Sequence, residues 1–89
     1  MKKEDAVEIL VAMEEEAKFA DGFEDAILGI GQQFSKPPVV VYDRNKCIKI
    51  LVERDGMPPD EAEEFFEVNT QGAWVGETTP VFVVTSTKL

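Results

Sequence analysis

Apolar residues recur along the chain with a spacing that changes from helical to extended and back. Over residues 4–18 they return every three or four positions, with glutamates between them, which is typical of an amphipathic helix. The members of this stripe are Ala6, Leu10, Met13, Ala17 and Ala20. The pair Asp21-Gly22 then interrupts the pattern, so the sequence predicts a first helix that ends before residue 21.

Residues 23–34 fit two patterns equally well. A helical stripe would hold Phe23, Ala26, Ile27, Ile30 and Phe34, and one face of a strand would hold Ala26, Leu28, Ile30 and Phe34. Gly29 and Gly31 would each cost a helix interior about 1 kcal/mol relative to alanine. We therefore expect a strand, with both glycines on its other face, where a neighbour can approach closely.

The next strand is predicted at Val39-Val40-Val41-Tyr42, an uninterrupted apolar run. Such a run, without alternation, is typical of a strand that is covered on both faces. Asp43 follows as a helix N-cap, and the helix should extend over residues 44–55 to Gly56, a residue suited to the left-handed turn of a C-terminal cap. This helix is expected to bury Cys47, Ile48, Leu51 and Val52, with Met57 completing the cap.

A third helix should begin at Pro59, because proline is favoured in a first helical turn, and continue to about Thr70. Its apolar face comprises Ala62, Phe65 and Phe66. A glycine-rich loop over residues 72–80 leads to a last strand at residues 81–85.

These elements predict one small α+β domain over residues 1–89, because a chain of this length supports a single core. The element order is α-β-β-α-α-β, with helices on a three-stranded, mainly antiparallel sheet. Short connections suggest that the last strand is antiparallel to the strand ending at Tyr42. On that layout Tyr42, the start of the second helix, the end of the third helix and the 72–80 loop meet at one edge of the sheet.

The charge of the chain indicates which kinds of partner it can bind. The net charge is −9, with −6 in residues 1–25, +3 in residues 26–52 and −7 in residues 53–77. Direct binding to nucleic acid is not expected, because it depends on basic groups that displace counterions. No apolar stretch approaches the roughly 20 residues that span a bilayer, and the acidic start is unlike a signal peptide, so neither a membrane nor export is expected.

The chemistry available to the chain is limited. It has no histidine and one cysteine, which excludes serine–histidine and cysteine–histidine catalysis, histidine-ligated zinc and an intrachain disulfide. Cys47 is expected to pack in the core, although a position near a helix start would lower the pKa of an accessible thiol. Glu63 and Glu67, four residues apart, are interpreted as a solvated helix face and not as a metal site. We therefore expect no catalytic residues, no metal, no cofactor and no enzymatic activity.

Eight residues are candidates for a binding site at the predicted edge: Tyr42, Asp43, Arg44, Lys46, Asn69, Trp74, Glu77 and Thr79. Arg44 and Lys46, at the start of a helix, would attract an anion. Asn69 falls on the apolar face of the third helix and would need a hydrogen-bond partner, either a ligand or the loop. Trp74 is either an interface residue or a lid on the core; we predict that it is at least partly exposed, with Glu77 and Thr79 at the same edge as Tyr42.

A long string of residues resembles a widespread family of small, uncharacterised proteins of tailed bacteriophages and prophages. The string comprises Tyr42-Asp43, Lys46-Cys47-Ile48, Ile50-Leu51, Arg54-Asp55-Gly56-Met57, Glu61-Ala62, Glu64-Phe65-Phe66-Glu67, Asn69, Gly72-Ala73, Val75-Gly76-Glu77 and Thr79-Pro80. The resemblance covers residues 26–84, and the first helix, residues 1–20, lies outside it. It implies a phage origin and a bacterial host cytoplasm as the setting, but no activity.

The function expected from the sequence is a non-enzymatic phage accessory protein that binds a host or phage protein during host takeover. One alternative is a binder of a small anionic ligand such as a nucleotide. Another is a nucleic-acid mimic, in which the acids of the first and third helices line one continuous face. Both a monomer and a homodimer are compatible with the sequence.

Overall fold

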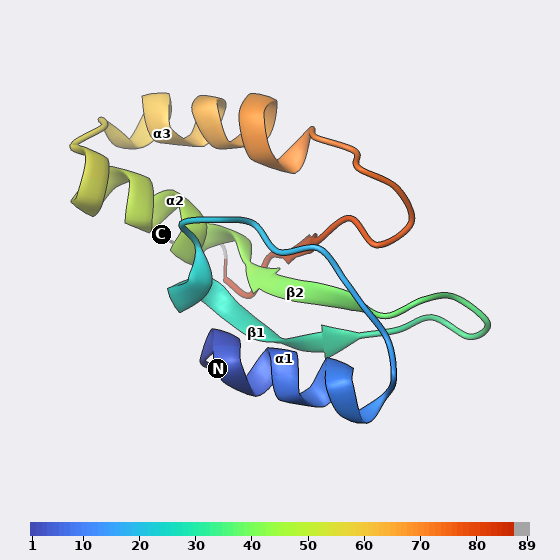
Figure 1. The fold of residues 1–89 in the computed structure, drawn as a ribbon. Helices are drawn as coiled ribbons and strands as arrows, with labels where there is room; N and C mark the ends of the chain where they lie inside the picture. Colours follow the sequence, from blue (N-terminus) through green and yellow to red (C-terminus); the bar gives the residue numbers. More distant parts are fainter. Residues whose placement is uncertain (87–89) are drawn as a thin grey trace.

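A computed structural model, which describes residues 1–86, has the predicted order of elements in one small α+β domain (Figure 1). Three helices pack with a three-stranded mixed sheet in these residues. The elements are α1 (Lys3–Ala12), a 3₁₀ turn η1 (Glu24–Ala26), β1 (Ile27–Gly31), β2 (Val39–Asp43), α2 (Arg44–Asp55), α3 (Pro59–Phe66), a π-helical turn η2 (Glu67–Gln71) and β3 (Val81–Val83).

The sheet has the order β1-β2-β3, and one of its two pairings differs from the prediction. β1 is antiparallel to β2, but β3 is parallel to β2, with Val81 opposite Val41 and Val83 opposite Asp43. The predicted antiparallel direction of β3 is therefore wrong. The reason is the path of the 72–80 loop, which runs back along the sheet so that β3 begins beside the middle of β2 (Figure 1). A crossover of this length is what a parallel pair requires.

The strand predicted within residues 23–34 is present as β1, but its faces differ from the expected ones. The pairing shifts between Ile27, opposite Tyr42, and Gly29, opposite Val41, which leaves Leu28 as an extra residue in a bulge. Ile27 and Ile30 consequently both contact the core, while Leu28 is exposed. A strict alternation could not predict this change of phase.

The second helix has the predicted bounds because both of its ends are specified locally. Asp43 Oδ1 accepts a hydrogen bond from the Lys46 backbone N–H at 3.2 Å, as an N-cap does. Gly56 adopts φ 71°, and both its N–H and the Met57 N–H donate to the Leu51 carbonyl, the second at 3.4 Å, so the helix ends in the predicted left-handed glycine cap.

The first helix ends earlier than predicted, at Ala12. Glu14 has a φ of 58°, and the Glu15 N–H donates to the Leu10 carbonyl at 3.0 Å, so the helix closes with a left-handed turn that lacks the usual glycine. Residues 15–20 then pass over the sheet without regular secondary structure (Figure 1). The Ala20 N–H donates to the Tyr42 hydroxyl at 2.7 Å, which ties this segment to β2.

The third helix buries Phe66 completely but leaves Phe65 42 % exposed, so the prediction for Phe65 is wrong. After Phe66 the backbone widens into η2, which changes the direction of the following side chains. The turn closes where the Gly72 N–H donates to the Glu67 carbonyl at 2.9 Å. A Cβ at position 72 would lie 2.9 Å from that oxygen, so glycine is required there by lack of space.

The core lies on one face of the sheet, where four aromatic rings contact one another in sequence. Phe23 meets Phe66 edge to face with 5.7 Å between ring centroids, Phe66 meets Phe82 at 5.0 Å, and Phe82 stacks on Tyr42 at 5.4 Å. The buried residues around them come from every helix and include Ala6, Ala26, Ile27, Val40, Cys47, Ile48, Leu51 and Ala62.

Phe65 and Phe66 provide a matched test of this arrangement. We expect Phe66→Ala to lower the free energy of unfolding by about 3–5 kcal/mol, because it removes a ring from the middle of the aromatic series and leaves a cavity. Phe65→Ala should cost less than about 1 kcal/mol, since that ring is substantially solvated. Urea midpoints of the two variants and the wild type measure the difference. Equal losses would contradict the assignment of the buried face of α3.

Candidate functional site

The face of the sheet opposite the core is lined by apolar residues that no helix in residues 1–86 covers. Its members, here called the valine face, are Val39, Val41, Val81 and Val83, with Gly29 and Gly31. The residues that alternate with them, Val40, Tyr42 and Phe82, belong to the core. A solvated sheet face normally carries polar residues, so valines at these positions are unusual. The predicted coverage of β2 on both faces is therefore met only in part within residues 1–86, because Val39 and Val41 are half-buried and not buried.

A hollow of about 460 Å³ opens on the valine face. Val39, Val41, Val81 and Gly31 form its floor, and Trp74 lies at its side. A Cβ at Gly31 would lie 2.9 Å from Val41 Cγ2, so the bare backbone of β1 leaves room for the Val41 side chain. Trp74 is 74 % exposed, which confirms the predicted exposure and excludes the alternative of a core lid.

Glu77 and Thr79 lie beside Trp74, and not at the edge of Tyr42 as predicted. Since β3 is parallel to β2, the loop must return to the opposite end of the sheet, where the turn between β1 and β2 lies. There Lys36 Nζ is 3.9 Å from Glu77 Oε1. The Thr79 hydroxyl accepts the Val75 N–H at 2.9 Å and donates to the Gly76 carbonyl at 2.6 Å, which fixes the tip of the loop.

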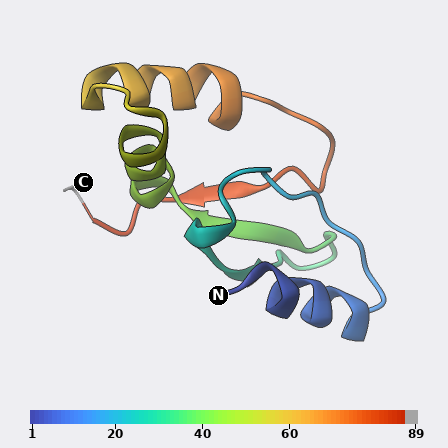
Figure 2. The same cartoon turned by 60° about the vertical axis from the view of Figure 1, so that its left-hand side comes forward.

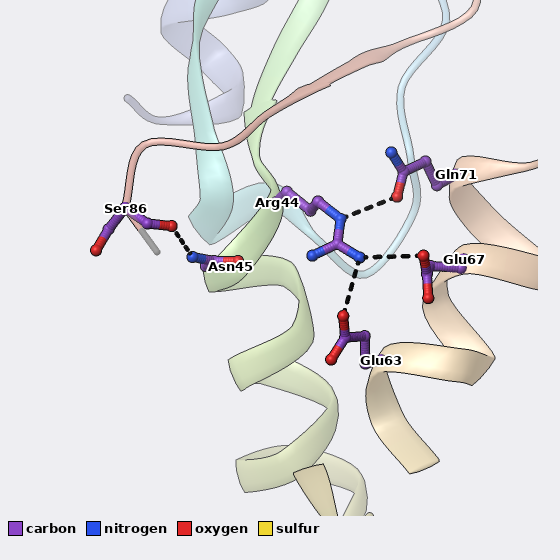
Figure 3. A network of polar contacts seen from close by, with 6 residues as sticks. All are labelled: Arg44, Asn45, Glu63, Glu67, Gln71 and Ser86. Carbon is purple, nitrogen blue, oxygen red and sulfur yellow. Dashed lines mark hydrogen bonds and ion pairs between the residues drawn. The ribbon is translucent and has the colours of Figure 1, made fainter. Parts of the chain in front are cut away.

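Arg44, one of the candidate anion-binding residues, is held within the fold (Figure 3). Its Nη2 lies 3.5 Å from Glu63 Oε1 and 3.4 Å from Glu67 Oε2, and its Nε donates to Gln71 Oε1 at 3.0 Å. The predicted meeting of the second helix's start with the third helix's end is thus confirmed. The two carboxylates neutralise the arginine, which leaves little positive charge for a ligand.

Asp43 and Lys46, the other residues at the predicted anion site, do not form such a site either. The Asp43 carboxylate caps the first turn of α2 and accepts the Thr85 hydroxyl at 3.1 Å, so a negative group stands where an anion would bind. Lys46 is exposed on α2, away from Trp74. The side chains of Asp43 and Arg44 are therefore parts of the scaffold, whereas Lys46 contributes its backbone N–H to the cap.

Tyr42 and Cys47 are fully buried. Burial raises the pKa of Tyr42, and the hydroxyl accepts the Ala20 N–H. Burial also raises the pKa of Cys47 to about 12, with a smaller contribution from the Asp43 carboxylate. The expected core position of this cysteine is confirmed, and the helix start does not activate it.

Asn69 is exposed, so its predicted place on the buried face of the third helix is wrong. The π-helical turn η2 shifts the phase of the helix just before this residue. Its Nδ2 donates to the Phe65 carbonyl at 3.1 Å, and its side chain borders a separate hollow of about 240 Å³ near Phe23 and Phe82. The eight candidate residues therefore do not form one site.

The acidic helices α1 and α3 lie on opposite sides of the molecule in two views (Figures 1 and 2). Their carboxylates do not form the single continuous face that a nucleic-acid mimic requires. Among residues 1–86, no group of three or more histidine, cysteine or acidic side chains is arranged to hold a metal ion. No helix in that part of the chain is both long and apolar enough to traverse a bilayer.

The valine face is not among the eight residues that the sequence predicts for a binding site. The run of valines in β2 indicated two covered faces, and the second apolar run, Val81 to Val84, repeated that indication. Comparison of the whole chain with protein-family models, curated proteins and solved structures finds no match. The site's own geometry is therefore the basis for a function.

The raised pKa of Cys47 gives a prediction about pH. The native thiol, with a pKa of about 12 against an ordinary value of 9.0, holds its proton more tightly than the unfolded thiol does. Its contribution to stability should be complete below pH 9 and be lost as the pH rises towards 12. Urea midpoints should fall between about pH 8 and about pH 10 more steeply in the wild type than in Cys47→Ala.

The same variant controls for Tyr42, whose raised pKa acts in the same direction. In addition, a thiol reagent should modify the native wild type only as fast as the protein unfolds. Rapid modification of the folded protein would contradict the burial of Cys47.

Proposed function

We propose that this protein is a non-enzymatic protein-binding module and that the valine face with Trp74 is its binding surface. The observation that carries the proposal is a sheet with valines on both faces and helices on only one. Burying such a face against a partner removes apolar surface from water, at about 25 cal/mol per Å². Tryptophan beside it supplies the type of residue that most often dominates interface energetics.

The composition of the hollow supports binding over chemistry. Valine and glycine form its floor, and the charged groups beside it, Lys36 and Glu77, are exposed and paired with each other. An exposed ion pair of this kind contributes at most about 1 kcal/mol, so a partner can rearrange it at little cost. A complementary partner would present a convex apolar surface with β-branched or aromatic side chains.

The setting of this function rests on the family resemblance. If the chain is a tailed-phage protein, the partner is a host or phage protein in the bacterial cytoplasm, and binding serves host takeover. The binding of a small anionic ligand has weaker support, because Arg44 is neutralised by Glu63 and Glu67.

Trp74→Ala tests the binding surface. We expect the variant to lose capture of the partner from host or infected-cell lysate while its free energy of unfolding changes by about 1 kcal/mol or less, since the ring is mostly solvated. Phe65→Ala is a matched control, because it removes another exposed ring from a different side of the molecule. It should capture the partner as the wild type does.

The captured protein then serves as the decisive reagent. Titrated into ¹⁵N-labelled wild type, it should shift the amide resonances of Val39, Val41 and Val81 and the Trp74 indole resonance. Shifts confined to α1 or α3, or equal capture by the wild type and Trp74→Ala, would refute the valine face as the binding surface.

A further inference from the structure

The outer edge of β3 is a second unpartnered feature, distinct from the valine face. β3 is at the end of the strand order, and within residues 1–86 its backbone pairs with β2 alone. An exposed strand edge presents a row of backbone N–H and C=O groups to any strand that can pair with it.

The two edges of the sheet differ in how they are protected. At the β1 edge, Leu28 forms a bulge, two glycines weaken the strand, and the Met1 amino group donates to the Ile27 carbonyl at 3.0 Å. Bulges and covering contacts are the usual protection against pairing between molecules. The β3 edge has no bulge in its pairing with β2, and residues 78–86 contain no charged residue.

The segment that includes β3 is also held in place for pairing. The Thr85 hydroxyl donates to Asp43 Oδ2 at 3.1 Å. Next to it, Asn45 Nδ2 donates to the Ser86 carbonyl at 2.6 Å, as Figure 3 shows. Both contacts join the end of this segment to the start of α2, on the β2 side. They reduce the conformational entropy that a free segment would lose on pairing.

We propose that β3 pairs antiparallel with the β3 of a second copy of this chain across a twofold axis, forming a homodimer with a continuous six-stranded sheet. A twofold axis needs only one exposed strand, because the same edge serves both partners. The uncharged segment also favours a second copy as the partner. It has no acidic side chain that would select a basic strand of another protein. It also keeps charged residues of two chains, each of net charge −9, away from the paired strands.

The size and charge of this interface determine how the dimer behaves. A standard interface buries about 800 Å² on each partner, and one short strand ladder supplies only part of that. Val84 and the ends of the valine face on β3, Val81 and Val83, add their exposed side chains to it. We therefore expect a concentration-dependent equilibrium between monomer and dimer. Salt should increase the dimer fraction, because it screens the repulsion between the two acidic chains.

Val84→Lys tests the proposal. Val84 is 60 % exposed just after β3, and a lysine at this end of the ladder would place a charge against the partner's strand, which is how strand edges are usually protected from pairing. Val68→Lys is the matched control, since Val68 is 70 % exposed on η2 and has no part in the edge. Sedimentation over a range of concentrations should show a dimer for the wild type and Val68→Lys, and a monomer for Val84→Lys. Circular dichroism checks that all three proteins are folded.

A sample mixed from labelled and unlabelled chains locates the interface. Nuclear Overhauser effects between chains should connect residues within 81–85 to one another. A monomeric wild type at every concentration, a Val84→Lys variant that dimerises as the wild type does, or inter-chain effects from Val39 and Val41 instead would each overturn the proposal. Val84→Lys leaves Trp74 and the valine face intact, so partner capture by this variant tests the proposed function separately.

Discussion

The contact of Phe82 with both Phe66 and Tyr42 joins the last strand to the central strand and to the third helix. Phe82 belongs to the last strand, Tyr42 to the central strand and Phe66 to the third helix, so one ring joins three elements from distant parts of the sequence. Phe23 extends the series to the segment that crosses from the first helix. Aromatic pairs of this kind add about 0.5–1.5 kcal/mol each beyond the area they bury.

The same arrangement explains why one face of the sheet is left without helices. The helix residues of the buried core, among them Ala6, Ile48 and Phe66, lie on the side of the aromatic rings. No helix within residues 1–86 covers the valines on the other side. In a small domain, residues that would be core in a larger protein become a surface, and such surfaces commonly mark interaction sites.

Local chemistry determined what could be predicted from the sequence. Asp43 and Gly56 specify the ends of α2 within a few residues, and the whole helix followed from them. The strand at β1 followed from its glycines, but the bulge at Leu28 depends on pairing with β2, which no local pattern records. Glu14 closes α1 with a left-handed turn in a residue that seldom adopts one, so the end of that helix was misplaced.

The direction of β3 and the outward position of Asn69 could not be predicted, because neither is specified by the residues next to it in the sequence. The direction of β3 depends on the path of the 72–80 loop, and residues within the loop do not specify where it ends. The π-helical turn at Glu67–Gln71 adds a shift of phase that turned Asn69 outward. The predicted site was therefore divided: Trp74, Glu77 and Thr79 stayed together at one end of the sheet, and Asp43, Arg44 and Lys46 became part of the scaffold at the other.

The parallel pairing of β3 with β2 has a consequence for the order of folding. β1 and β2 are joined by a short turn, and α2 and α3 by another, so both pairs can form from neighbouring residues. β3 can dock only after residues 44–80 have closed a long loop, which costs entropy before any contact forms. Until β3 docks, Phe82 and its flanking valines lie outside the core. The docking of β3 is therefore the step at which aggregation competes with folding of this domain.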